Sequence, residues 1–191
     1  MYEVEAKFRV PDVNEFQHRL HCFGCPPFGS AVEETDWFFA HPSKDFRQSD
    51  ECLRLRCRFY PNGETERFLT YKGPKIDSQT KTRKEIEIQI PDSESTEQLL
   101  TALGFRQAAA VRKYRQRTQA VVEGREIEIT LDVLPDLPEA VRTFAELETM
   151  SVESEWESGK ALILDIAAEL GLTESVRTSY LHLCGTSEPP R

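Results

Sequence analysis

The chain has 191 residues, of which 39% are hydrophobic and 30% charged, and its formal net charge is −9. This composition is typical of a folded globular protein, and the acidic balance argues against a nucleic-acid-binding surface, which needs clustered positive charge. No apolar run approaches the roughly 20 residues that span a bilayer, and no basic and apolar leader opens the sequence. We therefore expect a cytoplasmic protein, with one domain over residues 1–183 and a flexible tail over residues 184–191.

The first predicted element is a strand at residues 2–9, where charged and apolar side chains alternate. Glu3, Glu5, Lys7 and Arg9 recur at every second position, so all four fall on one face of the strand and the other face is apolar. Similar alternation and β-type composition predict further strands at residues 35–40, 53–58, 67–73, 85–90, 111–121, 126–133 and 143–149.

Helical patterns lie between these strands. Asp12 and Asp92 each follow a proline and precede a helical pattern, as N-cap residues do, and Gly24 and Gly104 end the two patterns. The two halves of the chain therefore resemble each other weakly as strand–helix–strand units. Further helices are predicted at residues 156–170 and 176–183.

The five cysteines are odd in number and irregularly spaced, which favours reduced thiols over a disulfide framework. An alternative is a zinc site formed by His18, His21, Cys22 and Cys25. These residues lie where a predicted helix ends in a proline-rich turn, so ordinary helix-end residues are the favoured interpretation.

About eight mostly antiparallel strands can close into a barrel that is lined by every second residue. The apolar faces, rich in Ile, Leu and Val, can be covered by the helices, and the charged faces would then turn inward around a wet lumen. The alternative is that the charged faces lie in solvent, and alternation alone favours that arrangement.

Segregation of the charges by sign favours the inward arrangement, because a solvated face tends to mix both signs. Clustered carboxylates repel one another unless a divalent cation such as Mg²⁺ or Mn²⁺ binds them, and clustered cations need an anion; a triphosphate with its metal satisfies both. The strand carboxylates are Glu3, Glu5, Asp132, Glu146 and Glu148. The strand cations are Lys7, Arg54, Arg56, Lys72, Lys113 and Arg115.

The segment Glu3-Val4-Glu5-Ala6-Lys7 resembles the ExExK signature of the CYTH family, which includes class IV adenylyl cyclases and thiamine triphosphatases. Further stretches follow in family order at residues 45–56, 69–74 and 81–87, then at Lys113, Arg115, Asp132, Glu146-Leu147-Glu148 and Ser179-Tyr180-Leu181. The resemblance covers about residues 1–183. It implies an α+β fold, in which a closed eight-stranded antiparallel barrel, the triphosphate tunnel, has flanking helices.

The resemblance also implies roles for the charged residues. Metal binding falls to Glu3, Glu5, Asp132, Glu146 and Glu148. Phosphate binding falls to Lys7, Arg54, Arg56, Lys72, Arg83, Lys113 and Arg115. Glu85 and Glu87 are further acids of the same tunnel, and the residues implied in catalysis are Glu5, Lys72 and Glu148. The sequence departs from the family at His41-Pro42, where some cyclase-like members have a longer motif, and this leaves recognition of a base or sugar open.

Residues 45–56 and 69–74 resemble the bacterial class IV adenylyl cyclase-like members, which implies conversion of ATP to cyclic AMP and pyrophosphate with Mg²⁺ or Mn²⁺. One alternative is an inorganic or thiamine triphosphatase. Another is a non-catalytic polyphosphate- or nucleotide-binding module, which the five acids disfavour because binding an anion needs only the basic residues. The expected partner is ATP or another triphosphate; neither nucleic acid nor a membrane is expected, and a homodimer is left open.

Overall fold

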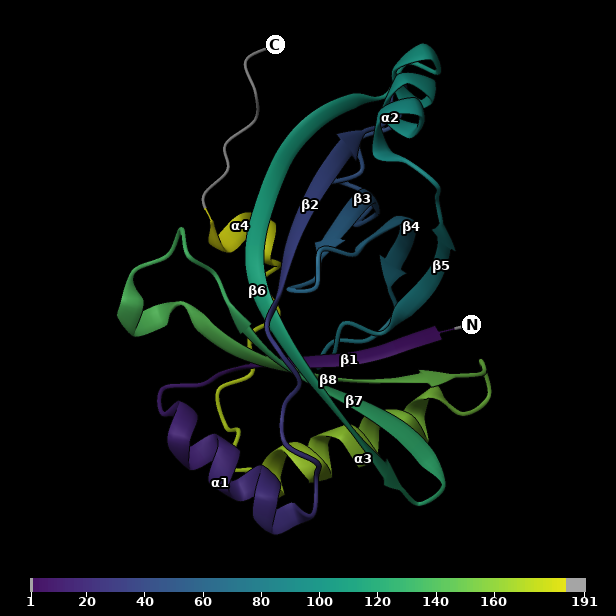
Figure 1. Ribbon diagram of the computed structural model, residues 1–191. Coiled ribbons are helices and arrows are strands. Elements are labelled where there is room, and N and C mark those ends of the chain that lie inside the picture. The colour runs from purple at the N-terminus through teal and green to yellow at the C-terminus, as the bar shows by residue number, and fades with distance from the viewer. Residues whose placement is uncertain (1, 185–191) are drawn as a thin grey trace.

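The computed structural model describes residues 2–184, and its eight strands close into one antiparallel barrel (Figure 1). The order of the strands around the barrel is β1-β5-β4-β3-β2-β6-β7-β8. The strands are β1 Tyr2–Arg9, β2 Val32–Ala40, β3 Cys52–Phe59, β4 Thr65–Lys75, β5 Arg83–Gln89, β6 Arg106–Val122, β7 Arg125–Val133 and β8 Thr143–Ser151. The predicted fold class is therefore confirmed, and each predicted strand lies within or overlaps an observed one.

The two halves of the barrel follow the same plan, since α1 follows β1 and α2 follows β5 in the chain. These helices span Val13–Phe23 and Ser93–Ala102. In both, the predicted aspartate accepts a backbone N–H three residues on, at 3.0 Å for Asp12 and 2.7 Å for Asp92. Gly24 and Gly104 follow the helices with φ of 91° and 90°, a backbone conformation that glycine adopts without strain. The weak internal repeat is thus visible in the structure.

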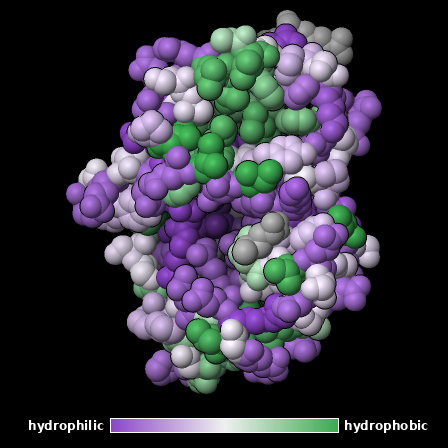
Figure 2. Space-filling model, turned by 90° about the vertical axis from the view of Figure 1, so that its right-hand side faces the viewer, coloured by the Kyte–Doolittle hydropathy of each residue, from purple (hydrophilic) through white to green (hydrophobic). Residues whose placement is uncertain are grey.

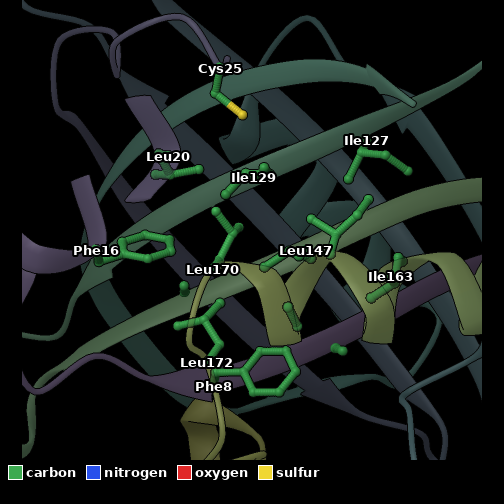
Figure 3. Close-up of a cluster of buried hydrophobic side chains, with 14 of the residues drawn as sticks. Phe8, Phe16, Leu20, Cys25, Ile127, Ile129, Leu147, Ile163, Leu170 and Leu172 are labelled. Atoms are coloured by element: carbon green, nitrogen blue, oxygen red, sulfur yellow. The ribbon is translucent and has the colours of Figure 1, made fainter. Parts of the chain in front are cut away.

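The largest apolar cluster lies outside the barrel, where α1 and α3 (Trp156–Glu169) cover β1, β7 and β8 (Figure 3). Phe8 of β1, Phe16 of α1, Ile129 of β7 and Ile163 of α3 are all buried there. Each such side chain contributes about 1.5–3 kcal/mol when it leaves water. Because these helices hold the apolar face of β1, its charged face must turn into the lumen.

The lumen-facing charges of β1 are as deeply buried as its apolar residues. Glu3 and Glu5 are each 6% exposed and Lys7 is 1% exposed. Lys7 lies opposite Glu146 of β8 and Glu5 lies opposite Glu148, so these side chains share the inner face of the barrel with the acids of that strand. The inward arrangement of the charged faces is confirmed, and the solvent-facing alternative is wrong for this strand.

Helices cover the apolar strand faces as predicted on one side of the barrel, but they leave the apolar face of β5 exposed. α2 packs over a second cluster around Phe39, Leu55 and Leu100, whereas Ile86 and Ile88 on the outside of β5 are 52% and 54% exposed. A helix of ten residues is only about 15 Å long, so it covers part of the sheet surface and leaves the rest bare. Figure 2 shows a hydrophobic area on this side of the molecule, above a hydrophilic hollow.

The C-terminal part of the described chain crosses one end of the barrel. The predicted helix at residues 176–183 is shorter than expected, because α4 spans only Tyr180–Leu183. The N–H of Val176 donates to the Lys7 carbonyl at 2.7 Å, so the chain here runs beside β1 until Ser179 caps α4. Tyr180 then packs with Phe144 in a third cluster that fills this end. From residue 185 on, the predicted tail lies outside the described residues.

None of the helices formed by residues 2–184 combines the length and hydropathy needed to cross a lipid bilayer.

Candidate active site

Three carboxylates meet on one wall of the lumen. Glu5 lies directly opposite Glu148 across the β1–β8 pair, and Glu3 lies two residues along β1 on the same face. One oxygen from each of the three lies within 4.8 Å of the others, and within residues 2–184 this is the one such group that could hold a metal ion. Oxygen donors are what Mg²⁺ and Mn²⁺ prefer, so the donor set fits the predicted cation.

Electrostatics in this cluster favour a bound cation. Burial, followed by repulsion from Glu3, Glu128 and Glu5, raises the pKa of Glu148 to about 8. The pKa values of Glu3 and Glu5 are raised as well, chiefly by burial and also by a neighbouring carboxylate, Glu85 and Glu146 respectively. Clustered acids that are costly to ionise are stabilised by a divalent cation, which supplies the missing positive charge.

Two lysines partly compensate the charge of Glu3 and Glu5. The Lys72 ammonium lies 2.7 Å from a Glu3 oxygen and 2.6 Å from Glu85. Lys81 bonds to Glu5 and lies 3.1 Å from Glu146. Because Glu3 and Glu5 each pair with a lysine, a small rearrangement of the two lysines would free their carboxylate oxygens for a metal and the ammonium groups for an anion.

Metal affinity is therefore expected to depend on pH through Glu148. Below about pH 8 its carboxyl carries a proton in the metal-free protein, and a cation must displace that proton to use the oxygen. The affinity for Mn²⁺, measured by titration calorimetry, should rise by up to about tenfold per pH unit between about pH 6 and pH 8 and then level off. Glu148→Gln should make this profile less steep, because Glu3 and Glu5 still titrate in the variant. A wild-type affinity that is constant over the range would contradict the assignment.

The other two predicted metal ligands pair with an arginine instead. Arg115 Nε donates to Asp132 at 2.6 Å, and its Nη2 donates to Glu146. The Tyr180 hydroxyl also donates to Asp132 at 2.8 Å. The structure thus brings together three of the five predicted ligands, while a metal-binding role for Asp132 and Glu146 stays a prediction.

The opposite wall carries the predicted phosphate-binding residues on β3 and β6. Arg54, Arg56, Lys113 and Arg115 are all buried, at 2–8% exposure, although each is charged. Basic side chains buried this deeply need acidic partners. Arg56 and Lys113 pair with acids of the neighbouring strand β2, and Arg115 pairs with Glu146 across the lumen. The wall therefore offers guanidinium and ammonium donors of the kind that bind phosphate oxygens.

The remaining predicted residues also lie in or beside the lumen. Lys7 donates to the Thr178 carbonyl and lies 4.0 Å from the centre of the Tyr180 ring, and burial, followed by Lys81, lowers its pKa to about 7. Arg83 is 8% exposed and donates to the Gly73 carbonyl. The acids of β5 have cationic neighbours, because Glu85 pairs with Lys72, and Glu87 lies 3.5 Å from Arg54.

The charged residues of the lumen that were not predicted from the sequence include Glu34, Asp36, Lys81 and Glu128. Arg56 donates two hydrogen bonds, of 2.6 and 2.7 Å, to Asp36, and Glu34 is completely buried. Their spacing of two residues was a usable signal, but the predicted strand at 35–40 began one residue too late to include Glu34. Lys81 lies in the β4–β5 loop, where no alternation marks an inward side chain.

The alternative zinc site is not assembled. Cys22 and His18 lie on α1 with 3.7 Å between Sγ and Nε2, and Cys25 is buried in the apolar cluster beside the barrel. Residues 18–25 do not form a metal-binding group in the described structure. All five cysteines are free thiols, as predicted.

Comparison with known proteins agrees with this geometry. The family model of the CYTH domain matches residues 1–180. "Putative adenylate cyclase MJ0240" of Methanocaldococcus jannaschii is 34% identical over 189 residues, which covers 97% of this chain and 99% of the relative. "Adenylate cyclase CyaB" of Aeromonas hydrophila is 28% identical, over 97% of this chain and 90% of the relative. The structure of the PH1819 protein from Pyrococcus horikoshii OT3 superposes with a TM-score of 0.80 at 36% identity, over 95% of this chain and 97% of that one.

Proposed function

Because the chain belongs to the CYTH family, we propose that it is a metal-dependent enzyme that converts ATP into cyclic AMP and pyrophosphate in the lumen of its barrel. The observation that carries this proposal is the presence of two oppositely charged groups inside one closed barrel. They are the acidic cluster of Glu3, Glu5 and Glu148, and the basic wall formed by Arg54, Arg56, Lys113 and Arg115. The adenylate cyclase names of two relatives that align along nearly the whole chain support the choice of reaction.

In this reaction the ribose 3′-hydroxyl attacks the α-phosphorus and pyrophosphate leaves. Glu3, Glu5 and Glu148 would hold the metal, which supplies positive charge against the phosphates when bound. Arg54, Arg56, Lys113 and the other basic residues would hold the triphosphate by charge-assisted hydrogen bonds and offset the charge of the leaving group.

Proton transfer falls to the acidic side of the lumen. A carboxylate of the acidic cluster would accept the proton of the attacking hydroxyl, and binding of the metal would release the proton that Glu148 carries below about pH 8, so that its carboxylate can act. Lys72 lies 2.7 Å from Glu3, close enough to the cluster to contact a phosphate held there. We therefore assign Glu5, Lys72 and Glu148 as the catalytic residues.

The second candidate is a triphosphatase, in which water attacks the terminal phosphorus of inorganic or thiamine triphosphate. The observation that favours it is the chemistry of the lumen, whose charged groups recognise phosphate and metal, the parts that ATP and tripolyphosphate share. A non-catalytic binding module fits less well, because an anion-binding module would not need the repelling acids Glu3, Glu5 and Glu148.

Product analysis separates these functions. With ATP and Mn²⁺ or Mg²⁺, the purified protein is expected to form cyclic AMP and pyrophosphate, with slower release of phosphate from tripolyphosphate. Chromatography of the nucleotides and a phosphate assay measure both. ADP and phosphate from ATP, or rapid cleavage of tripolyphosphate without a cyclic nucleotide, would replace the cyclase by the triphosphatase. Binding of ATP or tripolyphosphate without turnover of either would favour the non-catalytic binding module over both enzymes.

A further inference from the structure

Glu34 is an acid in the middle of the basic wall. It lies on β2 between the two basic strands, directly opposite Arg58 of β3 and Lys113 of β6. Its carboxylate is 2.9 Å from Arg58 Nε, 3.2 Å from Lys113 Nζ and 3.3 Å from Arg56 Nη1, and it also bonds to Arg117. No part of the side chain is exposed.

A carboxylate in this position occupies donors that a phosphate would use. Glu34 accepts single hydrogen bonds from Arg58 and Arg117 and forms ion pairs with Arg56 and Lys113, so it acts as a resident anion of the basic wall. Burial alone would raise its pKa, but Arg56, Lys113 and the neighbouring arginines outweigh burial and hold the pKa well below its usual range. The carboxylate is therefore charged at neutral pH, and the basic wall is partly neutralised before any substrate enters.

This charge balance is expected to affect the binding of a metal-free triphosphate and of its metal complex differently. A metal-free triphosphate carries four or so negative charges, and it meets both a partly neutralised basic wall and the repelling acids Glu3, Glu5 and Glu148. The same anion complexed with a divalent cation carries less charge and brings the cation that those acids need. A wall without Glu34 would instead attract the bare anion strongly.

We propose that Glu34 is a specificity-determining residue, which makes the lumen select metal-complexed triphosphates over metal-free ones by neutralising part of the basic wall. The inference rests on the proposed binding of triphosphates in the lumen. Glu34 contacts the phosphate-binding side chains rather than the reacting atoms, so its effect appears in binding selectivity.

The test is titration calorimetry of tripolyphosphate, once with excess EDTA and once with Mn²⁺. Glu34→Gln keeps the shape and removes the charge, so it is expected to bind the metal-free anion about tenfold more tightly or better, with a smaller gain for the Mn²⁺ complex. The matched control is Glu33→Gln on the same strand, whose side chain alternates to the outer face. That control is expected to leave both affinities at the wild-type values.

Equal changes in the two affinities, or weaker binding of both, would show that Glu34 only positions the arginines, and would overturn the proposal. If Glu34→Gln does not fold, the wild type provides the test, because the proposal requires it to bind the Mn²⁺ complex of tripolyphosphate more tightly than the metal-free anion. Equal wild-type affinities for the two forms would overturn the proposal. Wild-type protein that binds tripolyphosphate under neither condition would refute the proposed function itself, a result distinct from failure of this inference.

Discussion

Replacing Glu148 by glutamine is expected to lower kcat by about a hundredfold or more without harming the fold. The substitution removes the negative charge of one of the three carboxylates whose oxygens lie within 4.8 Å of one another, a charge that the metal needs. Turnover at saturating Mn²⁺ measures the loss. Wild-type turnover in Glu148→Gln under these conditions would contradict the metal assignment.

Stability provides the control for this variant. The pKa of Glu148 in the fold, about 8, lies above its usual value, so its contribution to stability is present at low pH and is lost as the pH rises through about 8. Above that pH the charged carboxylate opposes folding, and glutamine removes this cost. Thermal unfolding of metal-free protein at about pH 9 should therefore give Glu148→Gln a Tm at or above that of the wild type.

Glu146→Gln should abolish turnover too, but with the opposite effect on stability. Glu146 accepts a hydrogen bond from Arg115 and pairs with Lys81, and those contacts, with its other cationic neighbours, hold its pKa well below the usual range despite burial. Its loss leaves two buried cations short of a partner, so the same unfolding experiment should show a lower Tm. Equal Tm changes for the two glutamine variants would contradict this difference between the acids.

Replacing Arg56 by alanine is expected to destabilise the fold by about 3–5 kcal/mol, a larger effect than the loss of one phosphate contact. Arg56 is 4% exposed and makes two hydrogen bonds to Asp36 and an ion pair of 3.3 Å with Glu34. Burial alone would raise the pKa of Asp36, but Arg56 and Arg54 lower it to about 2, so the acid would be left charged and buried. Urea unfolding followed by circular dichroism measures the change in the free energy of unfolding.

Arg19→Ala is the matched control for this experiment. Arg19 also forms a short ion pair, at 2.7 Å with Glu15, but both side chains are about half exposed on α1. An exposed pair of this kind contributes under about 1 kcal/mol. If Arg56→Ala costs no more than Arg19→Ala, the basic wall is not held by the acids of β2, and the role given to Glu34 loses its structural basis.

The sequence predicted the barrel because its pattern has a period of two on strand after strand. In β1 the alternation of charged and apolar residues placed Glu3, Glu5 and Lys7 on one face, and the grouping of acids and cations by sign across the strands favoured an inward position for the charged faces. The caps Asp12 and Asp92 were predictable for an equally local reason, since a capping side chain bonds to the backbone three residues away.

What could not be predicted depends on contacts between distant segments. Lys81 lies in a loop, and its position between Glu5 and Glu146 follows from the closure of the barrel rather than from any local pattern. The helix predicted at residues 176–183 is shorter for a similar reason, because the N–H of Val176 donates to the carbonyl of Lys7, which is distant in the sequence. The exposure of Ile86 likewise depends on how far α2 reaches across the sheet.

A metal and a triphosphate are expected to bind together between the acidic cluster and the basic wall of the lumen. A crystal structure of the protein with Mn²⁺ and tripolyphosphate, with anomalous scattering recorded at the manganese edge, tests it most directly. The account predicts an anomalous peak among Glu3, Glu5 and Glu148, with phosphate density against Arg54 and the other basic residues of β3 and β6. Manganese or phosphate bound only outside the lumen, with the three carboxylates still free of metal, would contradict it.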